Sequence, residues 1–182
     1  VAVATKVDID NFETLTLNAL GSVSAATVTI ADMDADAATA ITVKGTQNVI
    51  FTDISDVVAT TTTIDASELT ADFTISELGE AVKSITGSAT ETNAITVAAD
   101  NVNSSATFTG GAADDDTLVD GGVTGNNGIL NISGIETVTL TTGGAFEADL
   151  RAVTGMETLT INSSADNVIL NRMDLATTTL DI

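Results

Sequence analysis

The residue types that could bind an ion lie together in one stretch, Thr109 to Gly122. Glycine lets the backbone adopt positive φ and expose its carbonyls, and a hard cation such as calcium takes carboxylate and carbonyl oxygens as ligands. The stretch therefore predicts a turn, a short strand and another turn that together bind a calcium ion. The alternative from the same residues is an acidic turn that is only solvated. The candidate ligands are Gly110, Gly111, Asp114, Asp115, Asp116 and Asp120.

A second acidic cluster consists of Asp32, Asp34 and Asp36. Its D-x-D-x-D spacing matches the opening of an EF-hand loop, but Ala37 stands where that loop needs glycine, and Val43 stands where it needs a bidentate glutamate. The cluster is therefore not an EF-hand. We expect it either to bind calcium weakly, in a surface loop or against a neighbouring copy, or to be a solvated loop.

The charge balance of the chain is strongly acidic. Twenty-six acidic residues against five basic ones give a formal net charge of −21 over 182 residues. Such a field repels phosphate backbones, so nucleic acid is not an expected partner. It also destabilises the folded chain by self-repulsion unless cations screen or bind it. With no His and no Cys, zinc, copper and iron–sulfur ligand sets are missing, so any metal site would be made of oxygen atoms.

The same inventory argues against an enzyme. His, Cys and Tyr are absent as general bases or nucleophiles, and no nucleophile elbow, Walker loop or dinucleotide fingerprint occurs. Paired carboxylates can hydrolyse glycosides, and a polysaccharide-acting solenoid enzyme is one alternative. Sugar sites usually use aromatic platforms, however, and aromatic residues are only 3 % of the chain. We expect no catalytic activity.

A short unit recurs in which an apolar residue precedes Glu-Thr and an alternating strand. It begins at Phe12, Ile135 and Met156, and the glutamates of the last two units, Glu136 and Glu157, are 21 residues apart. That interval is typical of one coil of a solenoid. Alternation of Thr with Val, Leu or Ile gives each strand a threonine face and an aliphatic core face. Helix signals are sparse and short, at 67–69, 76–82 and 146–153.

The pattern predicts an all-β fold of parallel β-solenoid or β-roll-like coils, with short helical turns at most. A threonine-rich β-sandwich is the alternative, because strands spaced about 9 to 12 residues apart fit both folds. We expect residues 1–182 to form a single elongated unit, with a subdivision, if any, near the Gly/Asp-rich loop 110–127. No apolar run approaches the roughly 20 residues of a membrane span, so no membrane span is expected.

Residues 110–118 resemble the nonapeptide G-G-x-G-x-D-x-U-x of RTX proteins, in which stacked turns of a β-roll hold calcium. Gly110 and Gly111 match the opening pair, and Asp116-Thr-Leu118 matches the D-x-U step. Ala113 stands in place of the second glycine, one extra residue precedes Asp116, and there is no tandem block. Together with the Glu-Thr-Leu-Thr strands, this segment is similar to the lattice-forming regions of RTX-type bacterial surface-layer proteins.

That resemblance implies type I export, a location on the bacterial cell surface, and calcium-dependent self-assembly into a two-dimensional sheet. The expected partners are other copies of the chain and, as anchor, cell-surface polysaccharide. A second hypothesis is a spacer segment of a secreted adhesin or extracellular filament, stiffened by calcium. Particle shape separates the two, because lattice-forming proteins make sheets and spacers make single fibres.

Overall fold

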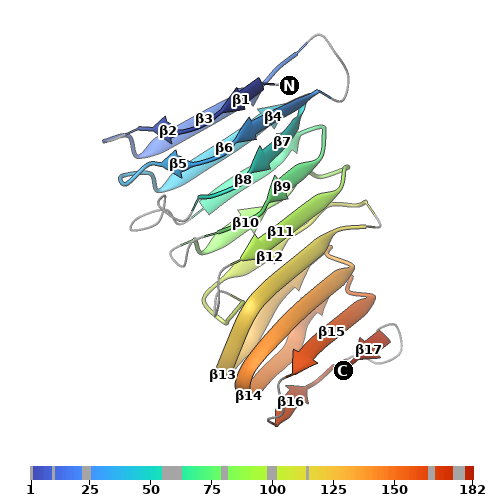
Figure 1. Cartoon of the computed structure of the whole chain (residues 1–182). Coiled ribbons are helices and arrows are strands. Elements are labelled where there is room, and N and C mark those ends of the chain that lie inside the picture. The colour runs from blue at the N-terminus through green and yellow to red at the C-terminus, as the bar shows by residue number, and fades with distance from the viewer. Residues whose placement is uncertain are drawn as a thin grey trace.

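The computed structural model is all-β, and its parallel strands stack into a β-solenoid of about 7 turns (Figure 1). It describes residues 2–9, 11–21, 26–54, 63–78, 82–97, 102–113, 115–163, 167–173 and 179–182. Every pairing between named strands is parallel, and neighbouring strands come from successive coils. The predicted solenoid is therefore confirmed, and the β-sandwich alternative is not what forms.

Each coil has three sections, which we call the first face, the short side and the second face. The first face contains β1 (Ala2–Ala4), β4 (Thr27–Ile30), β7 (Asn48–Phe51), β9 (Phe73–Ile75), β11 (Asn93–Val97), β15 (Thr158–Ser163) and β17 (Thr179–Asp181). The short side contains β2 (Val7–Asp8), β5 (Met33–Asp34) and β16 (Val168–Asn171). The second face contains β3 (Thr14–Ala19), β6 (Ala40–Gly45), β8 (Thr63–Leu69), β10 (Ser84–Thr86) and β12 (Thr107–Thr109).

Two long strands, β13 (Thr117–Ser133) and β14 (Thr137–Thr154), run through all three sections. Their first residues pair on the first face, residues 146–149 of β14 pair with β16, and their last residues continue the second face. Register shifts between Asp120 and Val123 and between Ile129 and Asn131 bend β13 around the corners. These two strands join the two faces into one continuous 15-stranded sheet.

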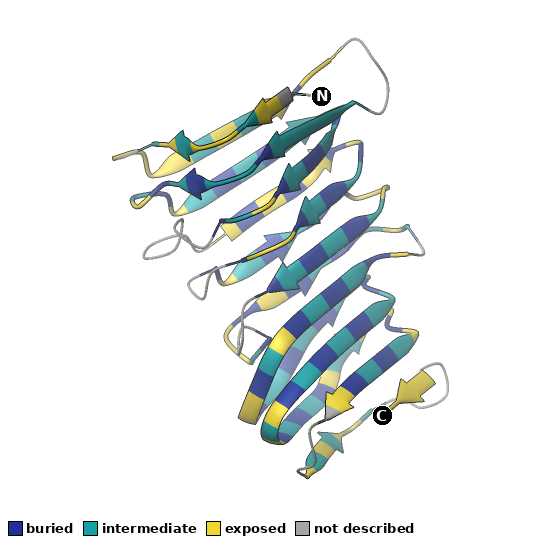
Figure 2. Ribbon diagram, in the orientation of Figure 1, coloured by how far each residue is buried: buried dark blue, intermediate teal, exposed yellow. Residues whose placement is uncertain are grey.

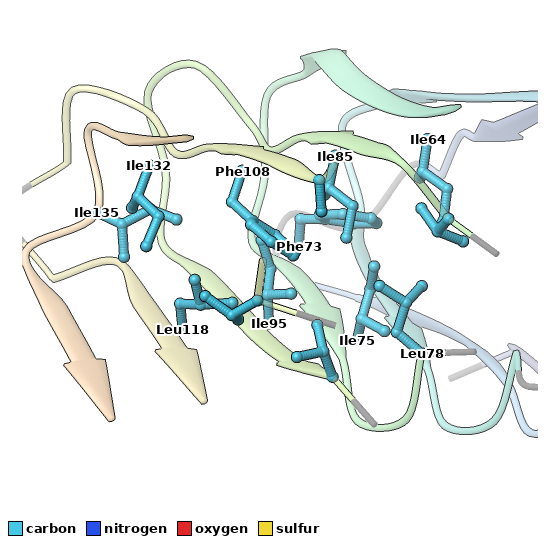
Figure 3. Close-up of a cluster of buried hydrophobic side chains, with 14 of the residues drawn as sticks. Ile64, Phe73, Ile75, Leu78, Ile85, Ile95, Phe108, Leu118, Ile132 and Ile135 are labelled. Carbon is cyan, nitrogen blue, oxygen red and sulfur yellow. The ribbon is translucent and has the colours of Figure 1, made fainter. Parts of the chain in front are cut away.

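The core is a set of aliphatic ladders along the solenoid axis. On the first face, Phe51, Ile75, Ile95, Leu118, Val138 and Leu159 occupy equivalent positions in successive coils. On the second face, the corresponding ladder is Ile41, Ile64, Ile85, Phe108 and Ile132. The two ladders face each other across the interior (Figure 3). Buried and part-exposed residues alternate along β13 and β14 (Figure 2), as expected for period-two strands.

The Glu-Thr repeat gives the correct register for two of its three units. Thr137 pairs with Thr158 on the first face, which is the 21-residue offset expected for one coil. The unit at Phe12 instead leads into β3 on the second face. The short helix candidates at 67–69 and 146–153 are strands instead, because these residues lie in β8 and β14. Parallel ladders on both sides satisfy the backbone there, and this tertiary pairing overrides local helix signals. Of the third candidate, residues 79–81 lie outside the described residues.

Candidate functional site

A column of glycines marks the corner where the second face turns back to the first. Gly87, Gly110, Gly134 and Gly155 follow residues that pair in register in successive coils. The backbone N–H of Gly110 donates to the Ser133 carbonyl at 2.9 Å, and that of Gly134 to the Thr154 carbonyl at 3.0 Å. Gly134 and Gly155 have φ of 56° and 84°, a region that favours glycine. The corner is therefore a tight turn repeated from coil to coil.

Asp116 lies directly inside this corner and is fully buried. Its Oδ1 accepts from the backbone N–H of Asn93 at 2.7 Å, and its Oδ2 accepts from that of Gly111 at 2.6 Å. The side-chain amide of Asn93 donates to both oxygens, at 3.1 and 3.0 Å. A buried carboxylate is tolerated only when its oxygens are hydrogen-bonded in this way. Asp116 thus ties the loop at Gly111 to the preceding coil.

Asn93 and Ser88 complete the network, and neither was recognised as a candidate from the sequence. Asn93 Oδ1 accepts from the Ser88 backbone N–H at 2.6 Å, and Asn93 Nδ2 donates to the Ser88 carbonyl at 3.0 Å. The Ser88 hydroxyl donates to the Leu69 carbonyl at 2.8 Å. Both residues are fully buried. The only sequence signal would have been Asn93, a polar residue in phase with the aliphatic positions Ile95 and Val97.

Asp120 is also fully buried. It lies in β13, four residues after Asp116 and at the opposite end of the first face. It occupies the inward ladder position between Val97 and Leu140. Its Oδ2 accepts from the Val102 N–H, and its Oδ1 from the Gly122 N–H, both at 2.9 Å. Asp116 and Asp120 therefore stabilise two separate corners and do not meet at one ion.

The remaining residues predicted at the glycine-rich loop are distributed as follows. Asp115 is exposed and accepts from the Thr92 hydroxyl at 2.8 Å. Asp114 lies outside the described residues. Glu136, which is in register with Asp116 in the next coil, accepts from the Asp116 backbone N–H at 3.0 Å. The structure thus brings Gly110, Gly111 and Asp116 together and leaves Asp115 at the surface.

The acidic cluster at 32–36 lies in the second coil, where β5 forms part of the short side. Asp34 is half-buried, and its Oδ2 accepts from Lys6 Nζ at 3.2 Å. This hydrogen bond raises the pKa of the Lys6 ammonium, and the charge of Asp34 adds to the effect. Asp32 accepts from the Val7 N–H through its backbone carbonyl at 2.8 Å. Asp36 is exposed.

The positions of the acidic side chains decide whether one copy could hold a metal ion by itself. Within the described ranges, no three acidic side chains converge as a metal site would require. A calcium ion on Asp116 would have to displace the N–H donors that saturate its oxygens, and these donors cannot turn into ligands. The buried aspartates therefore fit a structural role, while Asp36 and Asp115 are exposed at the surface.

A cluster of opposite charges occupies the end of the short side. Asp149 Oδ2 accepts from Arg151 Nε at 2.8 Å, and Arg172 Nη1 lies 3.6 Å away. The hydrogen bond from Arg151 lowers the pKa of the Asp149 carboxyl. Because the folded pKa lies below the unfolded value of about 3.9, this contribution to stability is present above pH 4 and is lost as the pH falls through the folded pKa.

We therefore expect Arg151→Gln to raise the pKa of Asp149 and to flatten the fall in stability below about pH 4. Carbon-detected NMR titration of the Asp149 carboxyl and urea midpoints at neutral and acidic pH measure the two effects. Arg172→Gln is the matched control, because Arg172 is the more distant cation and its loss should move the pKa less. Equal Asp149 pKa values in the two variants would contradict the assignment.

A shallow pocket of about 220 Å³ lies beside this cluster, lined in part by Phe146 and Ile169. At its rim, Glu147 accepts from the amides of Asn126 at 3.3 Å and Asn171 at 3.0 Å. These are ordinary side-chain ladders between coils, and none of the ligand residues predicted from the sequence lies in the pocket.

Comparison of the chain with protein-family models, with curated proteins and with solved structures gave no match. In the part of the chain that the structure describes, no helix has the length and apolar character needed to cross a membrane. The fold and the corner geometry are therefore the basis of the function proposed below.

Proposed function

We propose that the chain is a structural module of an extracellular bacterial surface layer, which assembles from many copies with the help of calcium. The observation that supports this proposal is the repetition of one coil along a single axis, with buried polar residues used to secure corners. A stack of uniform coils presents the same backbone edges and side-chain rows many times, which suits a building element of an array. The role is structural rather than catalytic.

The distribution of exposed apolar side chains also supports assembly. The large hydrophobic residues that are exposed in the described part of the chain all belong to the first coil or to the last two coils, and they are Val3, Phe12, Leu20, Ile169, Leu180 and Ile182. Leu20 is 73 % exposed and Phe12 is 60 % exposed. A further coil stacked in register from another copy would bury such residues and pair the open strand edges.

Calcium has a physical reason to act between copies. A net charge of −21 makes every approach of two copies repulsive, and divalent cations shared by carboxylates of both copies would cancel that repulsion. In this proposal, Asp36 and Asp115 are ligands divided between neighbours, and cell-surface polysaccharide anchors the array. Assembly would then be switched by the ion.

The experiment is calcium titration of the purified chain with thermal unfolding and negative-stain microscopy, with and without chelator. Saturation about 100-fold above the dissociation constant should stabilise the assembled form by about 2.7 kcal/mol and produce ordered sheets. Sodium chloride at matched ionic strength is the control, because simple screening acts without specific binding. Single fibres would favour the spacer alternative, and unchanged stability and particle shape would exclude a role for calcium.

A further inference from the structure

Two neighbouring rows of outward positions on the first face contain no charged residue, and the outward row beside them contains Asp72 and Asp115. The first row runs in register along the axis from β4 to β15, and the second runs from β11 to β15. We call this surface the threonine face. Its first row is Thr29, Ile50, Thr74, Ala94, Thr117, Thr137 and Thr158, and its second is Thr96, Val119, Thr139 and Thr160.

The threonine face is at the surface because the alternate residues fill the core. Leu118, Val138 and Leu159 are at most 1 % exposed, whereas the residues on either side of them, five threonines and Val119, are part-exposed. In Figure 2 this appears as regular bands across β13 and β14. The face is therefore a regular sheet surface of hydroxyl and methyl groups.

Neutrality distinguishes this surface from the rest of the molecule. On the second face, Asp65 lies in register between Thr42 and Thr86. Further along the same strands, Lys44 of β6 is in register with Glu68 of β8. The short side contains ions such as Lys6, Asp34 and Asp149. For a chain of net charge −21, these two neutral rows let another copy approach without burying like charges in the centre of the contact, while Asp72 and Asp115 lie at its rim.

We propose that the threonine face is a contact between two copies of this chain, packed face to face about a two-fold axis. This rests on the proposed function, because it names one of the surfaces by which the array would assemble. Rows of identical residues are self-complementary, as a two-fold contact requires. Stacked sheets pack about 10 Å apart through interdigitated side chains, and threonine offers both a methyl group and a hydroxyl at that distance.

The size of the face sets the strength of the contact. Strands spaced about 4.8 Å apart, of which four are about five residues wide and three about three residues wide, give roughly 450 Å² per copy. A pair then buries roughly 900 Å², below the standard size of a stable interface. A single pair is therefore weak, and the contact is effective when many copies repeat it in an array.

The test is sedimentation velocity over a concentration series in chelator and about 1 M salt, where the Debye length is about 3 Å and charge repulsion is screened. Wild-type protein should dimerise reversibly. Thr139→Asp places a charge in the centre of the contact from both copies, and we expect it to raise the dissociation constant about tenfold or more. Thr86→Asp makes the same change in net charge on the second face and should leave dimerisation at the wild-type level.

Thr139→Val keeps the face neutral and the side chain similar in shape, so it should dimerise like the wild type. Circular dichroism melting of each variant verifies folding, and Thr137→Asp replaces Thr139→Asp if the latter does not fold. Dimerisation of the Asp variant at wild-type strength overturns the inference, as does a monomeric wild type that still forms calcium-dependent sheets. After either outcome, calcium-dependent sheets of the wild type would still support the proposed function. A wild type that stays monomeric both in high salt and in calcium would contradict the inferred contact and the proposed function together.

Adsorption of the threonine face to another material would also overturn the proposed contact between copies. If wild-type protein, but not Thr139→Asp, bound to ice or to a crystalline polysaccharide while both proteins remained monomeric, the face would have a different occupant.

Discussion

Asp116→Ala should lower the free energy of unfolding by about 3 to 5 kcal/mol. The substitution leaves the backbone N–H groups of Asn93 and Gly111 without their acceptor, and the Asn93 amide keeps only its carbonyl partners such as Ser88. Each buried donor without a partner costs about 1 to 3 kcal/mol. Urea unfolding followed by circular dichroism measures the loss.

Asp115→Ala is the matched control for this prediction. It removes the same charge from the adjacent position, but Asp115 is exposed and accepts a hydrogen bond from the Thr92 hydroxyl at the surface. Its effect should stay within about 0.5 kcal/mol. Equal urea midpoints for the two variants would show that Asp116 is not the tie between the coils.

Gly110→Ala should be similarly severe, at about 3 to 5 kcal/mol. A Cβ at this position would overlap the Gly134 carbonyl oxygen and Asp116 Oδ2. The first of these is backbone of the next coil, so relief requires the glycine column to separate. Thermal and urea unfolding of the variant give the size of the effect.

Gly121→Ala provides the comparison, because a Cβ there would meet nothing within 4 Å. We expect it to be neutral or to stabilise by about 0.4 to 1 kcal/mol, since alanine restricts the unfolded chain. Combining Gly110→Ala with Asp116→Ala should cost less than the two single losses together, because one of the two overlaps disappears with the carboxylate. Full additivity, or a mild Gly110→Ala, would contradict the close approach.

The solenoid was predictable because its signals are local and repeated. Thr alternating with aliphatic residues defines each strand, and the 21-residue offset between Glu136 and Glu157 gives the register of their coils. The role of Asp116 was harder to predict. Its parity with Leu118 indicates that it points inward, and one donor, Gly111, is close in the sequence, but the other donors come from Asn93, 23 residues away. Such a distant partner leaves no pattern near Asp116 in the sequence.

The helical turns expected at 67–69 and 146–153 failed for the same reason. Both segments belong to strands that pair with neighbouring coils. The Asp65 side chain accepts from the Ser67 N–H at 2.9 Å, so a local turn does occur there. It bends β8 without ending the strand, as the register shift between Thr42 and Lys44 records.

The offset of 21 residues between Thr137 and Thr158 also has a consequence for how the chain acquires its structure. Each coil contacts only its neighbours, so folding can begin in one place and advance by one coil at a time. A chain that leaves a ribosome or a narrow channel end first can therefore fold as it emerges, because every new coil finds its complete template already formed behind it.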